Sequence, residues 1–160
     1  MVRDSIEQQF ARRTSGSREL WERGSAVMPS GVSAAVKYFP PYPIYLERAE
    51  GSQVWDVDGN EYVDFLSALL AVSLGYDDPD VVAAVEAQMK DGTLFSLPHP
   101  IEIEVAEKLC ALVPCADMVR FGKNGSDATA GAVRLARAHT GRDRVAVCGY
   151  HGWHDWYLAA

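Results

Sequence analysis

The sequence has no long apolar run, few cysteines and more negative than positive charge. It holds 15 Lys and Arg against 22 Asp and Glu, a formal net charge of −7. Nucleic-acid binding needs clustered cations that neutralise phosphates, so we expect no general nucleic-acid partner. No apolar stretch is long enough to span a bilayer, and the start, MVRDSIEQQFARR, lacks the apolar segment of a secretory signal. We therefore expect no membrane association.

The cysteines are too few and too irregularly spaced for a disulfide framework or a cysteine-based metal site. Cys110, Cys115 and Cys148 are an odd set without paired metal-binding spacing, which predicts reduced thiols and a cytoplasmic location. Neither G-x-x-x-x-G-K-[ST] nor G-x-G-x-x-G occurs, which disfavours an ATP- or NAD-binding domain. What remains is a chain of 160 residues with the ordinary composition of a soluble globular protein and enough length for one core.

Helices are predicted where apolar residues recur at helical spacing between capping residues. The segment that begins at Asp4 has helical character, interrupted at Ser15–Ser17 and ended at Pro29–Gly31. Further along, Asp and Pro residues at the start and Gly or Pro at the end delimit three more helices. These lie in DDPDVVAAVEAQMKDG, in PIEIEVAEKLCALVP and over 126–139.

Strand signals fall into two groups. After a proline-rich stretch, 44–48 is predicted as a short strand, and the alternation around Asp58-Gly59-Asn60 predicts a hairpin. MVRF (118–121) and RVAVCGY (144–150) flank the last helix, which predicts a βαβ unit in a parallel sheet. Parallel sheets need cover on both faces, so we expect the front part of a larger α/β protein with exposed apolar helix and strand faces.

The turn KNGSDA before the last helix has two possible purposes. Asn124 suits the N-cap and Asp127 the N3 position of a capping box, which would be sufficient as a purely structural role. Alternatively, the lack of a side chain at Gly125 and the hydroxyl of Ser126 would suit an anion such as phosphate at the positive end of the helix. The residues alone leave both interpretations open.

The segment CGYHGWHDWY follows the second predicted parallel strand, at the same predicted sheet edge as the turn. Tyr150 could lay a flat ring over a planar ligand. His151 and His154 with Asp155 have a spacing seen in metal sites, but no further ligand is apparent and we predict no metal site. The alternative is an aromatic loop that packs against another part of the protein.

Three segments in order carry a resemblance to a known family. WDVDGNEYVDF, MVRFGKNGSDATAGAVRLARAHTGRD and GYHGWHDW resemble the class III (subgroup II) aminotransferases, which use pyridoxal phosphate (PLP). Within that class the likeness is strongest to the glutamate-1-semialdehyde 2,1-aminomutase branch. The resemblance extends from about Pro29 to the last residue.

The resemblance implies an α/β fold: the N-terminal part of the type I PLP-dependent transferase (aspartate aminotransferase-like) fold, with a mixed or parallel sheet flanked by helices. Residues 1–70 would be an N-terminal segment with helix and β-hairpin, part of the small domain. Residues 71–160 would be the first part of the large PLP-binding domain. The family implies a homodimer that acts on a small-molecule amino donor and a carbonyl acceptor.

The resemblance also implies site residues. Gly125 and Ser126 would bind the cofactor phosphate, Tyr150 would stack on its pyridine ring, and His151 would shape the same wall. Lys37 stands where the family has an Arg that binds the substrate carboxylate, and Lys is a point charge rather than a two-pronged donor. Leu69 replaces an aromatic residue of the substrate site. These two differences leave a semialdehyde, another amino acid, a β-amino acid and an amine all open as substrates.

No catalytic residue is assigned within the chain. The family carries its cofactor on a lysine that lies far beyond position 160, and none of the lysines present is assigned to that role (Lys37, Lys90, Lys108 and Lys123). We expect PLP-dependent amino-group transfer or an aminomutase reaction in the parent protein. The alternative is a non-catalytic α/β fragment that binds a phosphorylated ligand or a partner protein.

Overall fold

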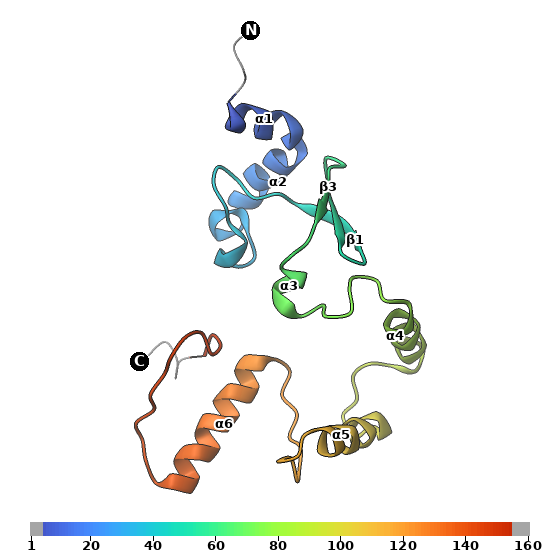
Figure 1. Ribbon diagram of the computed structural model, residues 1–160, viewed down its shortest axis with the longest axis vertical. Helices are drawn as coiled ribbons and strands as arrows, with labels where there is room; N and C mark the ends of the chain where they lie inside the picture. Colours follow the sequence, from blue (N-terminus) through green and yellow to red (C-terminus); the bar gives the residue numbers. More distant parts are fainter. Residues whose placement is uncertain (1–4, 155–160) are drawn as a thin grey trace. The chain divides into compact units, whose positions relative to one another are not determined.

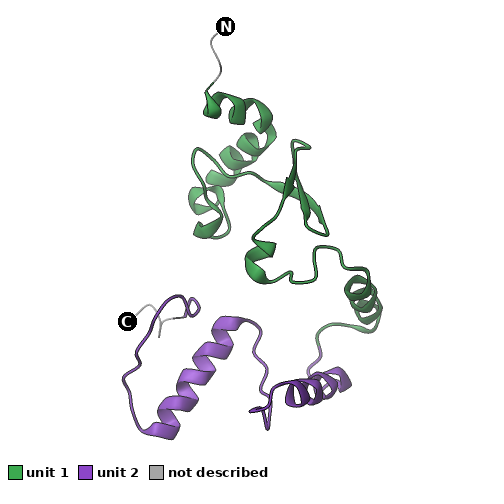
Figure 2. Cartoon of the chain, in the orientation of Figure 1, with its two compact units in different colours: residues 1–94 green, residues 95–160 purple. Residues whose placement is uncertain are grey.

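The computed structural model describes residues 5–154, and the chain forms two compact units (Figures 1 and 2). The first unit is Met1–Leu94 and the second is Phe95–Ala160. The division into domains after residue 70 concerns the complete fold of the family and stays a prediction. No helix in the described part is both long enough and apolar enough to cross a membrane.

Two short helices open the first unit. Helix α1, Ile6–Arg13, begins with a capping box in which the Ser5 and Gln8 side chains bond each other's backbone N–H. Helix α2 is Ser15–Ser25. The break between them is at Thr14 (φ −131°, ψ 40°), so the prediction of an interruption at Ser15–Ser17 is wrong. Those residues begin α2, because an acceptor from elsewhere in the unit binds their N–H groups.

A three-stranded antiparallel sheet follows, with the strand order β1-β2-β3. The strands are β1 (Leu46–Glu50), β2 (Gln53–Asp56) and β3 (Glu61–Val63). In the register, Val54 lies opposite Ala49 on one side and Tyr62 on the other. The predicted hairpin around Asp58-Gly59-Asn60 is confirmed, and the strand predicted over 44–48 begins two residues later.

The small core of the first unit lies between the helix pair and the sheet. Tyr42 is at its centre, with its ring 5.0 Å from that of Phe10 and 6.0 Å from that of Trp21. The Tyr42 hydroxyl lies 3.1 Å from Oγ1 of Thr14, which is 1% exposed. Two short 3₁₀ turns, Pro29–Gly31 and Ala35–Lys37, connect the helices to the sheet.

The turn after β3 has a left-handed backbone, which is unusual for residues other than glycine. In α3, Ser67–Leu70, all four residues have positive φ, from 46° to 70°. A left-handed turn of this kind costs roughly 1 kcal/mol or more for each non-glycine residue. It persists because the Asp64 carboxylate accepts hydrogen bonds from the backbone N–H groups of Leu66 (2.7 Å) and Ala68 (3.4 Å).

Three regular helices make up most of the remaining chain, and all were predicted. They are α4 (Pro79–Asp91), α5 (Pro100–Leu112) and α6 (Gly125–Thr140). Asp78 caps α4, whose first residue is Pro79, and Gly92 follows its end. None of the three helices buries a residue, and apolar side chains such as Leu94 (93% exposed) and Met118 (90% exposed) lie open. The expected exposure of apolar faces is therefore confirmed.

The predicted parallel strand pair is absent from the described part of the chain. Residues 118–121 and 144–150 have no strand assignment. A strand is defined by its hydrogen bonds to a neighbour, and neither segment has a neighbouring strand among residues 5–154. The apolar runs therefore indicated segments suited to a sheet, but they did not predict which strand would pair with them.

Candidate functional site

The start of α6 is built by a reciprocal cap. Asp127 N–H donates to Asn124 Oδ1 (2.9 Å), and Asp127 Oδ2 accepts from the N–H groups of Asn124 (3.2 Å) and Lys123 (3.1 Å). The capping box expected from KNGSDA is confirmed. Because Asp127 satisfies these two N–H groups, the site available to an outside acceptor is limited to the two residues between them.

Those two residues are Gly125 and Ser126. No acceptor within the described residues bonds their N–H groups, which belong to the first turn of a 16-residue helix, where the helix dipole is positive. A Cβ added at Gly125 would meet nothing within 4 Å, so no described atom crowds that side of Gly125. The turn therefore offers two N–H donors and a hydroxyl to an outside acceptor.

The aromatic segment folds back onto this turn. Trp153 N–H donates to Ser126 Oγ at 3.0 Å. The residue before it, Gly152, is buried and has a φ of +113°. A Cβ there would lie 2.8 Å from Ser126 Oγ and 3.1 Å from its Cα. Only glycine permits this approach, so contact between the turn and the described part of the aromatic segment, residues 148–154, is confirmed within the second unit.

Further bonds hold the same segment. Thr129 Oγ1 donates to the carbonyl of His151 (2.9 Å), and His151 Nε2 donates to the carbonyl of Cys148 (2.6 Å). His154 Nε2 lies 3.6 Å from Asp127 Oδ1, an ion pair when the imidazole is protonated. The predicted ring residue, Tyr150, is 73% exposed. The sequence reasoning missed Thr129, which carries no motif signal.

The predicted substrate residue Lys37 belongs to the other compact unit. Lys37 ends the 3₁₀ turn Ala35–Lys37 in the first unit, and its Nζ donates to Ser33 Oγ at 3.2 Å. Gly125, Ser126 and Tyr150 belong to the second unit. Within residues 5–154, no group of three or more His, Cys, Asp and Glu side chains could hold a metal ion. Asp155, which with His151 and His154 has a spacing seen in metal sites, lies outside the described residues.

The block WDVDGN (55–60), part of one segment that carries the family resemblance, has a structural role in this chain. Asp56 has no exposed surface and accepts from the N–H groups of Asp58 (3.0 Å) and Asn60 (2.7 Å), and from the Tyr62 hydroxyl (2.8 Å). Burial opposes ionisation of Asp56, but the hydrogen bond from the Asn60 side-chain amide (2.8 Å), together with these three, outweighs it and holds the pKa of Asp56 below the ordinary value. Burial and the bond to Asp56 raise the pKa of Tyr62 to about 12.

Asp58 connects this hairpin to α2. Its carboxylate accepts from the N–H groups of Gly16 (2.6 Å) and Ser17 (3.0 Å) and from the Ser17 hydroxyl (3.2 Å). The local N-cap residue, Thr14, makes no side-chain cap bond. Asp58 therefore caps a helix that begins more than 40 positions earlier, and no local pattern announces this.

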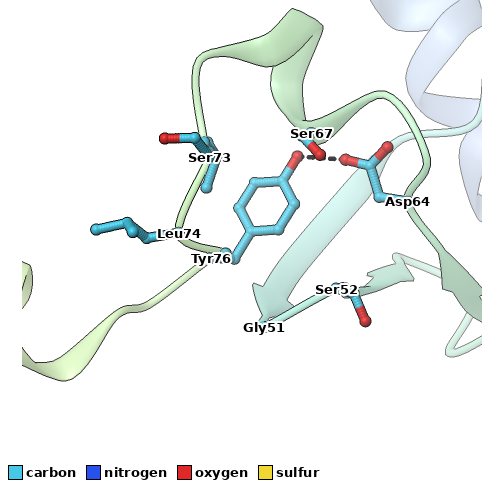
Figure 3. Close-up of a pocket in the computed structure, with 9 residues that line it drawn as sticks. Gly51, Ser52, Asp64, Ser67, Ser73, Leu74 and Tyr76 are labelled. Carbon is cyan, nitrogen blue, oxygen red and sulfur yellow. Dashed lines mark hydrogen bonds between the residues drawn. The ribbon is translucent and has the colours of Figure 1, made fainter.

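A pocket of about 330 Å³ lies beside the left-handed turn in the first unit (Figure 3). Its lining includes Asp64 and Tyr76, and the Tyr76 hydroxyl donates to Asp64 Oδ2 at 2.6 Å. This bond, with the Leu66 N–H, lowers the pKa of Asp64, and the same bond raises the pKa of Tyr76. Leu69, expected in a substrate site, belongs to the turn but does not line the pocket.

Comparison with known proteins identifies the family. The family model described as Aminotransferase class-III matches residues 34–160, most of the chain. The chain belongs to the class III aminotransferases. The glutamate-1-semialdehyde 2,1-aminomutase of Methanothermobacter thermautotrophicus is 46% identical over 144 residues, covering 89% of this chain and 34% of that protein. The predicted family is confirmed, and the chain spans about a third of the length of the curated relatives it matches.

Solved structures of transaminases have the same fold as this chain. A transaminase solved with PLP bound is 39% identical and superimposes with a TM-score of 0.85, covering 89% of this chain and 34% of that one. The β-phenylalanine aminotransferase of Variovorax paradoxus is 30% identical with a TM-score of 0.87, covering 91% and 34%. The α/β fold class is thus confirmed, and the family implies pyridoxal phosphate as cofactor.

Proposed function

We propose that these residues are the N-terminal third of a PLP-dependent enzyme that transfers an amino group or moves it within one molecule. The observation that carries the proposal is the start of α6, where the Gly125 and Ser126 N–H groups have no acceptor among the described residues, in a chain of this family. When bound, pyridoxal phosphate withdraws electrons from the carbon that bears the amino group, which makes its proton removable.

The donors at α6 fit the phosphate of that cofactor. Two N–H groups at a helix start, with the dipole behind them, form a ready anion site. The absence of a side chain at Gly125 leaves the volume that a phosphate oxygen needs. A Cβ at this position would point into that volume.

Ser126 supplies the third donor. A hydroxyl has one proton and two acceptor lone pairs. Its oxygen already accepts the Trp153 N–H, so its proton can be directed to a phosphate oxygen. The Trp153 bond thus orients the hydroxyl of Ser126 for donation.

Tyr150 would cover the ring of the cofactor, and His151 would form the same wall. Both lie on the segment that the Trp153 and Thr129 bonds fasten to α6. An exposed aromatic ring two positions before Gly152, which contacts Ser126, suits stacking on a planar heterocycle. The chain's own part in the reaction is therefore to bind and orient, since none of its lysines is assigned to carry the cofactor.

The substrate proposal rests on Lys37 and Leu69. Lys37 would contact a carboxylate of the substrate as a single charge, more weakly oriented than an arginine fork. Related proteins are named for glutamate-1-semialdehyde and for β-phenylalanine, so an amino donor with a carboxylate and a carbonyl acceptor is the class we propose. We also propose that the enzyme is a cytoplasmic homodimer without nucleic-acid or membrane partners. The net charge of −7 supports the absence of a nucleic-acid partner.

The test uses the complete gene product, the protein encoded by the whole reading frame that contains these residues. PLP affinity is measured by titration of the cofactor-free protein. The double variant Gly125→Val/Ser126→Ala should bind PLP at least roughly tenfold more weakly, because hydrogen bonds to a charged group are worth about 1.5–3 kcal/mol each. Gly131→Ala, on the same helix and also facing open space, is the matched control and should change affinity less than about twofold.

The outcomes separate two claims. A wild-type protein that binds no PLP would overturn the proposed function. Unchanged affinity in the double variant, with PLP bound by the wild type, would place the phosphate elsewhere and overturn the roles of Gly125 and Ser126.

A further inference from the structure

Two hydroxyls of α6 bond the backbone of the aromatic segment, one as acceptor and the other as donor. Ser126 and Thr129 are three positions apart and therefore share one face of the helix. Ser126 Oγ accepts from Trp153 N–H (3.0 Å), and Thr129 Oγ1 donates to His151 O (2.9 Å). Gly152, between the two bonded residues, contacts Ser126 directly. The three contacts fix a short stretch of backbone against the first turns of α6.

The Thr129 bond is unlike the ordinary bond of a helical threonine. Thr140, near the other end of α6, donates to the carbonyl of Ala136 within the helix at 2.7 Å. Thr129 Oγ1 has two acceptors: the carbonyl of Ser126, three positions earlier in the helix (3.1 Å), and that of His151, 22 positions away (2.9 Å). Its hydroxyl therefore connects two parts of the unit instead of serving the helix alone.

We propose that Thr129 is a positioning residue, which sets where the Tyr150 ring lies relative to the phosphate donors at the start of α6. This inference rests on the proposed function. His151 is tied on one side to Cys148 and on the other to Thr129, so Tyr150, directly before it, has little freedom in its backbone. Thr129 bonds Ser126 at its carbonyl (3.1 Å), not at the N–H or hydroxyl that would hold the phosphate, and it acts on the ring through the segment.

A positioning role for Thr129 predicts different effects on the binding of PLP and of inorganic phosphate. Inorganic phosphate uses only the donors of Gly125 and Ser126, whereas PLP also uses the ring of Tyr150. Loss of the Thr129 hydroxyl should therefore weaken PLP binding and leave phosphate binding nearly unchanged. A residue that merely stabilised α6 would affect both ligands alike.

The experiment compares variants of the complete gene product. Thr129→Val removes the hydroxyl at nearly constant shape, Thr129→Ser keeps it, and Thr140→Val is the matched control on the same helix. Thr129→Val should weaken PLP binding roughly fivefold, the effect of one ordinary hydrogen bond, and change the visible circular dichroism of the bound cofactor. Its affinity for inorganic phosphate, measured by competition with PLP, should change less than about twofold. Thr129→Ser should restore the wild-type signal, and Thr140→Val should match the wild type.

Two results would overturn the inference while the proposed function stands. One is PLP affinity and circular dichroism in Thr129→Val equal to wild type. The other is an equal loss of phosphate and PLP affinity, which would assign Thr129 to the helix and not to the ring. If Thr129→Val does not fold, Thr129→Ala is measured against the same two criteria. A wild-type protein without PLP affinity would instead refute the proposed function.

Discussion

Removal of the Asp58 carboxylate should loosen a helix that is distant in the sequence. Asp58 supplies acceptors for the Gly16 and Ser17 N–H groups and the Ser17 hydroxyl, and Ser17 has no exposed surface. In Asp58→Ala these buried donors lose their acceptor. We expect α2 to begin late or to fray at its first turn.

The magnitude follows from the kind of bond lost. A helix cap is worth about 1 kcal/mol and at most about 2 kcal/mol, and hydrogen bonds to a charged acceptor lie at the upper end. The Ser17 hydroxyl retains one bond, as acceptor from Tyr45 N–H at 3.1 Å, which limits the loss. A cost of about 2 kcal/mol corresponds to roughly 30-fold faster opening of α2.

Amide hydrogen exchange measured by mass spectrometry on the complete gene product reads this opening directly. Peptides from Ser15–Ser25 should exchange roughly 30-fold faster in Asp58→Ala, while peptides from α6 keep their rates. Glu47→Ala is the matched control, because it removes an exposed carboxylate from β1 of the same unit. Exchange in α2 that stays within about twofold of wild type, or that rises equally in Glu47→Ala, would refute the capping role of Asp58.

Three further predictions concern single sites. Gly152→Ala should displace the aromatic segment, since its Cβ would lie 2.8 Å from Ser126 Oγ at a φ of +113°, and limited proteolysis near residue 152 should become faster than in wild type. Asp56→Asn should cost roughly 2 kcal/mol at neutral pH. Because the folded pKa of Asp56 lies below 3.8, its stabilisation is present above that pH and lost below it, so acid unfolding curves of the variant should lack this loss. In Tyr76→Phe the pKa of Asp64 should rise toward its ordinary value in an NMR titration of the carboxyl; an unchanged titration would show that the backbone N–H groups alone lower it.

The parts of the fold that the sequence predicted are those whose signals are local. Helices α4, α5 and α6 each begin with a capping residue and a proline or glycine close by, and each was found within one or two residues. The hairpin was evident because Asp58-Gly59-Asn60 permits few other conformations. The cap at Asn124 and Asp127 was predicted for the same reason.

What the sequence did not predict depends on residues that are far apart or on an uncommon backbone. The cap from Asp58 to Gly16 and the bond from Thr129 to His151 join positions 42 and 22 apart, so no local pattern contains them. The left-handed turn Ser67–Leu70 contains no glycine, and nothing in those residue types announces positive φ. The strand pair at 118–121 and 144–150 was predicted from apolar runs, which do not specify a neighbour.

The bond between Asp58 and α2 has a consequence for the order in which the chain assembles during synthesis. Translation releases α1 and α2 before the hairpin that carries Asp58 exists. An uncapped helix of 11 residues is marginal in water, so α2 leaves the ribosome as a fluctuating segment. It becomes stable when β2 and β3 emerge and bring the carboxylate to its first turn. The N-terminal segment therefore closes as one event, set by the arrival of residue 58 and not by its own translation.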